Sequence, residues 1–409
     1  MNTLKKLLCY TILLLVLGSM PFALANQPDD DSTVILYTLD SPIMTVNGEQ
    51  RQIDAEGSVA FAERGRTFVP LRATFELFSI ELDFNRGVIT GTQGNTVIRL
   101  TLGNRIAYVN NRQIILDVAP FAINGRTMVP VRFIAESLGA NVEWIQSTQT
   151  VHISYSPLYV QLGNARLSIG DSQEKVNDIL GKPDRIDPSH LGFAWHVYNS
   201  DYSRFIMVGI LNGNVEVLYT NSRGFISNNV KYGDTPGSTD SHPRTIVYYD
   251  SNAGGIAHAV LIVSPNIENW RFTGDLRSTF IDAQNRQIFD MTNAFRVNYR
   301  KSVLSWNDTA ASTARKHSQD MATRNYFDHI GLDGSQPWDR FTREGGRWTS
   351  VGENLAGGFY LGIDAFDGWV NSPPHREGML ENFRFLGVGF GHNASSNYIW
   401  YYTQLFYSP

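Results

Sequence analysis

The sequence predicts a multidomain protein of the α+β class, and three observations lead to this prediction. The chain has 409 residues, enough for about two to four domains of ordinary size. A motif in its first half is duplicated, which is typical of a domain built from two repeats. Strand-like alternation and helical spacing both recur along the chain, so neither an all-helical nor an all-strand fold is expected.

The composition excludes several classes of protein. Hydrophobic residues make up 42% and charged residues 18% of the chain, which is typical of folded domains and not of disordered or collagen-like chains. The 34 basic and 39 acidic residues give a formal net charge of −5. Because a nucleic-acid partner calls for a basic excess that neutralises its phosphates, we expect no nucleic-acid binding.

The first 25 residues (1–25) have the features of a signal peptide. Lys5 and Lys6 precede an apolar stretch over 7–17, and Ala23-Leu24-Ala25 forms a small-x-small cleavage site. Cleavage would remove Cys9, the single cysteine, and leave a mature chain without a transmembrane segment, stabilised by its cores and not by disulfides. We therefore expect a secreted, extracellular or cell-wall-associated protein. The alternative is that this segment remains as an uncleaved anchor.

A short motif occurs twice between residues 41 and 155. Gly65-Arg66-Thr67-Phe68-Val69-Pro70-Leu71-Arg72 recurs as Gly125-Arg126-Thr127-Met128-Val129-Pro130-Val131-Arg132. Since proline restricts the residue before it to extended geometry, each copy predicts a strand that ends before a helix. We expect Arg72 and Arg132 to bond backbone carbonyls or carboxylates. The predicted helices and following strands are Ala73–Phe78, Ile80–Phe84 and Thr96–Leu100, then Phe133–Leu138, Asn141–Ile145 and Thr150–Tyr155.

The doubled motif resembles the copper amine oxidase N-terminal-like (stalk) domain, and the resemblance covers residues 41–155. An oxidase of that kind makes its quinone from a tyrosine in an Asn-Tyr-Asp/Glu setting. Here the three Asn-Tyr pairs are followed by Arg300, Phe327 and Ile399. The repeats contain one histidine, His152, which alone cannot hold copper. We therefore expect no oxidase activity.

Residues 158–285 form a second predicted unit. Asp171 and Glu174 have the spacing of a capping box at the start of a helix that ends at Gly181, and Asn212-Gly213 predicts a hairpin. Together with Leu180-Gly181-Lys182-Pro183 and Tyr198, the segment Asn212–Val215 resembles the CAP-associated domain that precedes bacterial CAP domains. Its histidines share no metal-binding spacing, so we expect scattered surface or core positions for His190, His196, His242 and His258.

A helix is predicted from Thr309 to about Arg324, with Asp308 as its cap. Its buried stripe, at helical spacing, consists of Ala310, Ala314, His317 and Met321. A histidine on such a stripe is most often a neutral core residue that is hydrogen-bonded to a partner.

Five further sequence blocks follow in order: Tyr326–His329, Gly352–Ala356, Trp369–Arg376, Leu386–Gly391 and Trp400–Phe406. Their order and identity resemble the CAP superfamily (cysteine-rich secretory, antigen-five and pathogenesis-related proteins) in its cysteine-free bacterial branch, over residues 288–407. The resemblance implies an α-β-α sandwich, in which a central antiparallel sheet lies between helical layers. We expect the alternating glycines of the fourth block to let a neighbouring side chain approach the sheet.

In this family two histidines and two acidic residues converge in a surface cleft. Matched block by block, the resemblance assigns His329 and His375 to the histidines and Glu353 to the first acid. Ser372 stands in place of the second acid, and Pro374 stands where the bacterial pattern has glycine. The set of four is therefore incomplete.

Three roles remain open for His329, Glu353 and His375. Two imidazoles and a carboxylate can bind Zn²⁺ or another divalent metal and leave an open coordination position. That position would permit metal-assisted hydrolysis, with the three residues as the catalytic set. Alternatively, the three residues belong to a hydrogen-bonded network that braces the sandwich, and His317, Asn354 and Ser372 belong to the same network.

The sequence favours binding over catalysis, because it lacks a Gly-x-Ser-x-Gly elbow, a phosphate loop and the second acid of the cleft. We predict a secreted or cell-surface CAP protein that acts as a ligand-binding or scaffolding module at the bacterial envelope, with a metal-dependent, peptidase-like hydrolase as the alternative. A lipid, a glycan or a cell-wall fragment is the expected ligand; the sequence does not indicate the oligomeric state. Aromatic residues that either line a groove for this ligand or pack in the core are Trp338, Trp348, Phe359, Tyr360 and Trp369.

Overall fold

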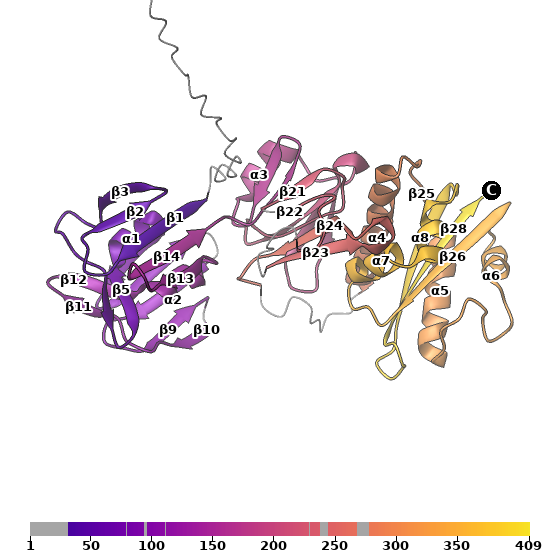
Figure 1. Ribbon diagram of the computed structural model, residues 1–409. Coiled ribbons are helices and arrows are strands. Elements are labelled where there is room, and N and C mark those ends of the chain that lie inside the picture. Colours follow the sequence, from indigo (N-terminus) through magenta and orange to yellow (C-terminus); the bar gives the residue numbers. More distant parts are fainter. Residues whose placement is uncertain are drawn as a thin grey trace, which may run out of the picture.

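The computed structural model describes residues 32–78, 80–93, 96–110, 112–228, 230–237, 244–267 and 278–409. The predicted signal peptide and His242 lie outside these residues. Figure 1 shows three groups of strands and helices that follow one another along the chain, coloured indigo to purple, magenta, and orange to yellow. This confirms the prediction of a multidomain α+β chain. No helix within the described ranges is long and apolar enough to cross a membrane.

The N-terminal module combines three antiparallel sheets with two short helices. The strand orders are β13-β14-β1-β2-β3, β10-β9-β8-β7-β6 and β11-β12-β5-β4. Helices α1 (Leu71–Leu77) and α2 (Val131–Ser137) begin directly after an extended proline, earlier than the sequence predicts. The strands are β1 (Thr33–Thr38), β2 (Ile43–Val46), β3 (Glu49–Gln52), β4 (Phe61–Glu63), β5 (Arg66–Pro70), β6 (Glu81–Asn85), β7 (Val88–Gln93), β8 (Thr96–Thr101), β9 (Ile106–Val109), β10 (Arg112–Ile115), β11 (Phe121–Ile123), β12 (Arg126–Pro130), β13 (Asn141–Ile145) and β14 (Thr150–Tyr155).

The two sequence repeats meet across an approximate two-fold axis. Strands β5 and β12 pair antiparallel with Val69 opposite Val129, so equivalent residues of the two copies face each other. Both valines are fully buried. Each copy also presents an arginine to an acid of the other copy, so the repeats interlock. These reciprocal ion pairs are Arg66–Asp117 and Arg126–Asp54.

The expected partner of the last arginine in the motif is present in one copy only. Arg132 donates to a Glu136 carboxylate oxygen at 3.1 Å. Arg72 makes no hydrogen bond or ion pair with any described residue, and its side chain is exposed. The expectation is therefore wrong for Arg72, which forms no such bond although Glu76 occupies the position equivalent to Glu136.

The central module has two antiparallel sheets, of orders β16-β15-β21-β22 and β17-β18-β19-β20-β24-β23. Asn212 and Gly213 form the predicted turn between β19 and β20, both with positive φ. Ser172, and not Asp171, caps helix α3 (Gln173–Leu180), because its hydroxyl accepts the Lys175 amide hydrogen. The strands are β15 (Tyr159–Leu162), β16 (Ala165–Ser168), β17 (Arg185–Pro188), β18 (Ala194–Tyr198), β19 (Ile206–Leu211), β20 (Asn214–Thr220), β21 (Phe225–Ser227), β22 (Val230–Lys231), β23 (Thr245–Asp250) and β24 (Ile256–Val263).

The C-terminal module contains a four-stranded sheet of order β25-β27-β28-β26. Strands β27, β28 and β26 pair antiparallel, but β25 pairs parallel with β27, so one edge of the sheet is mixed. Asn307 caps α5 by accepting the Ala310 amide hydrogen, a role that the sequence assigned to Asp308. The elements are α4 (Ser278–Asn298), β25 (Ser305–Trp306), α5 (Asp308–Arg324), α6 (Pro337–Arg343), β26 (Ser350–Gly357), α7 (Gly362–Val370), α8 (Pro373–Leu380), β27 (Phe385–His392) and β28 (Trp400–Ser408).

Helix α5 lies directly on strand β27. A Cβ atom added at Gly387, Gly389 or Gly391 would meet backbone atoms of α5 at 2.0, 2.0 and 2.3 Å. Two strand residues advance by about 6.6 Å and four helical residues by about 6.0 Å, so each glycine meets the next turn of the helix. The glycines therefore admit a helix backbone, where the sequence predicted only the approach of a side chain.

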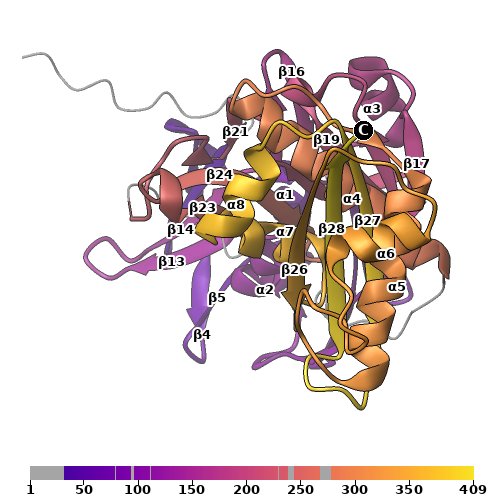
Figure 2. The ribbon, with the colours of Figure 1, turned by 90° about the vertical axis from the view of Figure 1, so that its right-hand side faces the viewer.

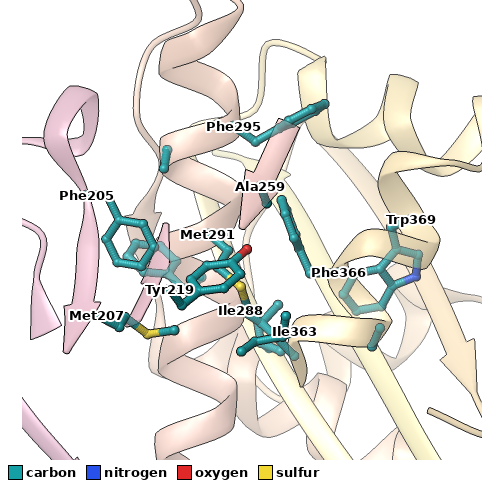
Figure 3. Close-up of a cluster of buried hydrophobic side chains, with 14 of the residues drawn as sticks. Phe205, Met207, Tyr219, Ala259, Ile288, Met291, Phe295, Ile363, Phe366 and Trp369 are labelled. Carbon is teal, nitrogen blue, oxygen red and sulfur yellow. The ribbon is translucent and has the colours of Figure 1, made fainter. Parts of the chain in front are cut away.

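The central and C-terminal modules share one hydrophobic core. Figure 3 shows side chains of β19, β20 and β24 packed against side chains of α4 and α7. A buried ion pair crosses the same boundary: Arg185 of β17 donates to Asp290 of α4 at 2.7 Å, and Asp290 is fully buried. The labelled core residues are Phe205, Met207, Tyr219, Ala259, Ile288, Met291, Phe295, Ile363, Phe366 and Trp369. These contacts make the two modules one packed unit.

Candidate functional site

Glu353 lies at the centre of the candidate site, on the edge strand β26. Since side chains alternate along a strand, Glu353 and Leu355 face α5 and Asn354 faces the opposite side. Only 2% of the Glu353 side chain is exposed. Its Oε1 accepts from Nδ1 of His329 at 2.9 Å, and its Oε2 accepts from Arg340 at 2.8 Å. Both oxygens of this buried carboxylate are therefore engaged by protein donors.

His329 lies in the loop between α5 and α6, and 49% of its side chain is exposed. Because a carboxylate only accepts hydrogen bonds, Nδ1 of His329 carries the proton of the bond to Glu353. This hydrogen bond raises the pKa of His329 above its ordinary value, against the opposing effect of burial. No described residue bonds Nε2 of His329, so that nitrogen is accessible to a ligand.

His317 lies beneath this pair on the buried stripe of α5, as the sequence predicts. Its Nε2 donates to the Asp328 carbonyl at 3.0 Å and lies 3.9 Å from Oε1 of Glu353. Burial lowers the pKa of His317, although the neighbouring Glu353 charge opposes this. The Nδ1 atom is buried and has no partner among the described residues. His317 is therefore a neutral core imidazole that contacts the site from below.

His375 lies on α8, at the other side of β26 (Figure 2). Its Nδ1 is hydrogen-bonded to the Ser372 hydroxyl at 2.8 Å. Burial lowers the pKa of His375, and the nearby His329 charge lowers it further. No hydrogen bond or ion pair joins His375 to Glu353 within the described chain. The structure thus brings His329 and Glu353 into contact and leaves His375 as a neighbour of the pair.

Asn354 connects α8 to the sheet. Its amide group donates to the His375 carbonyl at 2.9 Å and to the Gln404 side-chain oxygen at 3.0 Å. Only 3% of Asn354 is exposed, so these bonds are protected from water. Asn354 therefore holds the backbone of His375, and Ser372 holds its ring.

The donor set does not fit a metal site in which Glu353 is a ligand. One carboxylate oxygen accepts from the Arg340 guanidinium and the other from the N–H of His329, and the side chain is buried, so a metal ion would have to compete with both protein donors. No group of three or more His, Cys, Asp or Glu side chains within the described ranges is arranged to hold a metal ion. The Nε2 atoms of His329 and His375 remain as candidate donors.

Arg340, on α6, is a site residue that the sequence did not reveal. Besides Glu353, it donates to the carbonyls of His329 and Ser335 at 2.9 and 2.8 Å, and 12% of its side chain is exposed. The available sequence signal is a capping box of Gln336 and Asp339. That signal places Arg340 on a helix, but it does not place the helix beside Glu353.

Exposed apolar side chains flank His329. Phe327, Ile330 and Leu332 of the same loop are 39%, 45% and 54% exposed. The Phe327 ring lies 5.0 Å from the ring of Tyr398, which is 44% exposed. The surface around His329 thus combines a titratable imidazole with apolar groups.

The aromatic residues that the sequence assigned to a groove or a core divide between these environments. Trp369 is 1% exposed and donates to the Leu355 carbonyl, so it is a core residue. Phe359 and Tyr360 are partly buried. Trp338 and Trp348, in and beside α6, are 42% and 39% exposed. Only these two indoles are therefore available to a ligand over a large part of their surface.

Comparison with known proteins identifies each module. Residues 45–153 match the copper amine oxidase N-terminal domain, residues 169–240 match the CAP-associated N-terminal domain, and residues 289–406 match the cysteine-rich secretory protein family, CAP. The C-terminal module is therefore a match to the CAP family, and it follows segments that match the CAP-associated N-terminal domain and the copper amine oxidase N-terminal domain.

Two relatives from Bacillus subtilis (strain 168) resemble the chain in sequence. "Uncharacterized membrane protein YlbC" is 27% identical over 315 residues, which are 64% of this chain and 87% of that protein. "Uncharacterized protein YkwD" is 34% identical over 127 residues, which are 31% of this chain and 48% of that protein. A crystal structure of an extracellular protein containing a SCP domain, from Bacillus anthracis str. Ames, shares the fold with a TM-score of 0.51. It is 24% identical, and the match covers 59% of this chain and 94% of that chain.

Proposed function

We propose that the chain is an extracellular envelope protein that binds an amphipathic lipid at the surface around His329 and His375, which corresponds to the cleft of the CAP family, and catalyses no reaction on it. In this proposal the C-terminal module is the α-β-α sandwich of CAP domains, with α5 on one face of the sheet and α4 and α7 on the other. The two preceding modules support and present the cleft.

The observation that carries the proposal is the engagement of the Glu353 carboxylate. A general base or a metal ligand must direct an oxygen lone pair at its reactant or ion. Glu353 directs one oxygen at Arg340 and the other at His329, and it is buried. At the position of the second family acid, Ser372 supplies only a hydroxyl, which is bonded to His375. Glu353 is therefore held by two protein donors, and the position of the second acid offers no carboxylate.

The surface chemistry supports an amphipathic ligand. Phe327, Ile330 and Leu332 provide apolar contacts on both sides of His329 along the chain. The raised pKa of His329 favours its cationic form in mildly acidic conditions, in which Nε2–H donates to an anionic headgroup. An acyl chain against the apolar side chains and a phosphate or carboxylate against the imidazolium match both properties.

The proposed location at the envelope is drawn from the N-terminal sequence and from two related proteins. The segment 1–25 has the charge, apolar stretch and cleavage site of a signal peptide. One relative is named a membrane protein, and the structural neighbour is described as extracellular. Both descriptions agree with an envelope position for this chain.

The test uses the mature chain and vesicles of phosphatidylglycerol or phosphatidylcholine at about pH 6 and pH 8. We expect binding to phosphatidylglycerol vesicles that is stronger at the lower pH and that falls several-fold in His329→Gln. His152→Gln is the matched control, because His152 lies in the N-terminal module. If the wild-type chain does not bind the vesicles but binds purified wall glycan, the choice of a lipid as the ligand is refuted.

Metal analysis by mass spectrometry on the same samples tests the absence of catalysis. We expect no stoichiometric zinc in the wild type, in His329→Gln or in His375→Gln. One zinc ion per wild-type chain that both substitutions remove, together with a peptide cleavage that a chelator blocks, would instead support the hydrolase.

A further inference from the structure

A groove opens on the N-terminal module where the two sequence repeats meet. Its volume is about 800 Å³, within the range of roughly 300–1,000 Å³ that is usual for small-ligand sites. One wall consists of α1 and β6 from the first repeat, and the other of the β11–β12 hairpin from the second repeat and the loop that follows β3. Figure 1 shows this module at the opposite end of the molecule from α8, which carries His375. The groove is therefore separate from the surface around His329 and His375.

An exposed aromatic ring forms part of the groove wall. Phe84 of β6 lines the groove and is 51% exposed. Leu82 lies two residues earlier on the same face of the strand and also lines the groove. Ligand sites are commonly lined by apolar and aromatic side chains with a few polar groups among them. This wall therefore suits a ligand that has an apolar face of its own.

Two charged side chains of α1 line the groove without a partner. Arg72 and Glu76 are exposed and make no hydrogen bond or ion pair with any described residue. At the same spacing in the second repeat, Arg132 donates to Glu136 at 3.1 Å. Such a pair forms readily between residues four apart on a helix. Its absence in the first repeat leaves a hydrogen-bond donor, the guanidinium, and an acceptor, the carboxylate, available to a ligand.

The charges around the groove favour a neutral ligand. Arg126 is already paired with Asp54 and Glu56. With Arg72 and Glu76, the side chains that line the groove carry two positive and three negative charges, a formal net charge of −1 that does not attract an anion. A purely apolar ligand would remove Arg72 and Glu76 from water without bonding to them, which costs free energy. The fitting ligand is therefore neutral, with an apolar face and groups that both donate and accept hydrogen bonds.

We propose that this groove binds a neutral glycan chain. One pyranose ring lies with its C–H face against Phe84, because slightly positive C–H groups are attracted to the negative face of an aromatic ring. Its hydroxyls both donate and accept, so they bond to the Arg72 guanidinium and to the Glu76 carboxylate. One ligand thereby engages the exposed ring, the free donor and the free acceptor. The proposal does not depend on the binding of a lipid to the C-terminal module.

The second repeat serves as an internal comparison for the groove. Trp144 stands at the position equivalent to Phe84 and is 40% exposed, with its indole N–H donating to Gln146 at 2.8 Å. Ala73, which lines the groove, is replaced in the second repeat by Phe133, which packs against the core of the module. The small side chain of Ala73 keeps space open beside Arg72. We therefore expect a phenyl group at position 73 to fill the groove.

The experiment titrates the full mature chain with two neutral tetrasaccharides by calorimetry. Chitotetraose consists of N-acetylglucosamine and cellotetraose of glucose, so the two probes distinguish an amino-sugar glycan from a plain glucan as the source. We expect saturable binding of at least one probe. Phe84→Ala and Arg72→Gln are each expected to weaken it at least about fivefold, as the loss of one ring contact or hydrogen bond would. Trp144→Ala and Arg132→Gln are the matched controls and are expected to bind within twofold of wild type.

Ala73→Phe provides an independent test, because it introduces into the first repeat the side chain of the second. We expect this variant to keep the wild-type melting temperature within a few degrees and to lose measurable binding. If it does not fold, Phe84→Ala decides, since Phe84 lies at the surface. Vesicle binding by the C-terminal module is expected to be unchanged in Phe84→Ala, so the failure of one proposal is distinguishable from the failure of the other.

Three results would overturn the proposal. They are the absence of saturable binding of both tetrasaccharides, wild-type affinity in Phe84→Ala, and a loss in Trp144→Ala as large as that in Phe84→Ala. Tighter binding of tetragalacturonic acid than of both neutral probes would have the same consequence, because the preferred ligand would then be an anion.

Discussion

Replacement of Glu353 by glutamine tests whether this residue stabilises the fold through its buried hydrogen bonds or serves catalysis. The substitution keeps the shape of the side chain and removes its charge. A hydrogen bond to a charged group contributes about 1.5–3 kcal/mol and a neutral one about 0.5–1.5 kcal/mol. The bond to Arg340 is buried, whereas His329 is half exposed, so most of the loss arises at Arg340. We expect Glu353→Gln to lower the free energy of unfolding by about 2 kcal/mol.

The assay is urea unfolding at neutral pH, combined with an NMR titration of the histidine ring protons. We expect the pKa of His329 to fall in Glu353→Gln, because its hydrogen-bond partner no longer carries a charge. Glu377→Gln is the control, since Glu377 is exposed on α8. Surface substitutions usually change the free energy of unfolding by no more than about 0.5 kcal/mol. If wild type and Glu353→Gln agree within that limit, the buried network is refuted.

Three more substitution experiments test the packing and the electrostatics. Gly389→Ala places a Cβ atom 2.0 Å from the α5 backbone, so we expect the free energy of unfolding in urea to fall by at least about 3 kcal/mol. Gly378→Ala is the control, because the nearest atom there is a side-chain oxygen at 3.0 Å, and we expect a change within about 1 kcal/mol. Asp290→Asn removes one of the two buried carboxylates that pair with Arg185, while Asp187 remains as the other. We expect a loss of about 2 kcal/mol, with both modules unfolding together by tryptophan fluorescence and circular dichroism. The pKa of His329 is raised in the folded protein above its ordinary, unfolded value of about 6.5. Protonation of His329 therefore stabilises the fold fully below about pH 6.5, and this stabilisation is lost as the pH rises through the higher, folded pKa. We expect His329→Gln to lower the free energy of unfolding more at about pH 5.5 than at about pH 8.5.

Local patterns predicted much of the fold. Asn212-Gly213 specified a hairpin because positive φ at both positions suits those residues, and the turn is present. The stripe that includes His317 and Met321 followed from helical spacing, and both residues are buried. Strand β13 has the predicted bounds, because its alternation is short and clearly delimited. Such features depend on neighbours in sequence.

The features that sequence did not predict depend on contacts between distant segments. The sequence around Arg340 does not predict its hydrogen bond to Glu353, since the two residues belong to different elements. The alternating glycines of β27 predicted that another group lies close to this strand, but only the structure identifies that group as the backbone of α5. The groove beside α1 likewise joins both repeats, and only the three-dimensional arrangement brings Arg72 of the first repeat and Arg126 of the second to one cavity.

The central module takes part in positioning His375. Helix α8, which carries His375, has only eight residues, and isolated helices of that length are unstable in water. Its position must therefore come from tertiary contacts. Arg376, the next residue, donates at 2.6 Å to Asp250 of the central module, which is fully buried and also accepts from Tyr299 at 3.1 Å. Because removal of one member of a buried ion pair strongly destabilises its surroundings, the central module fixes the place of His375 as directly as the sheet does.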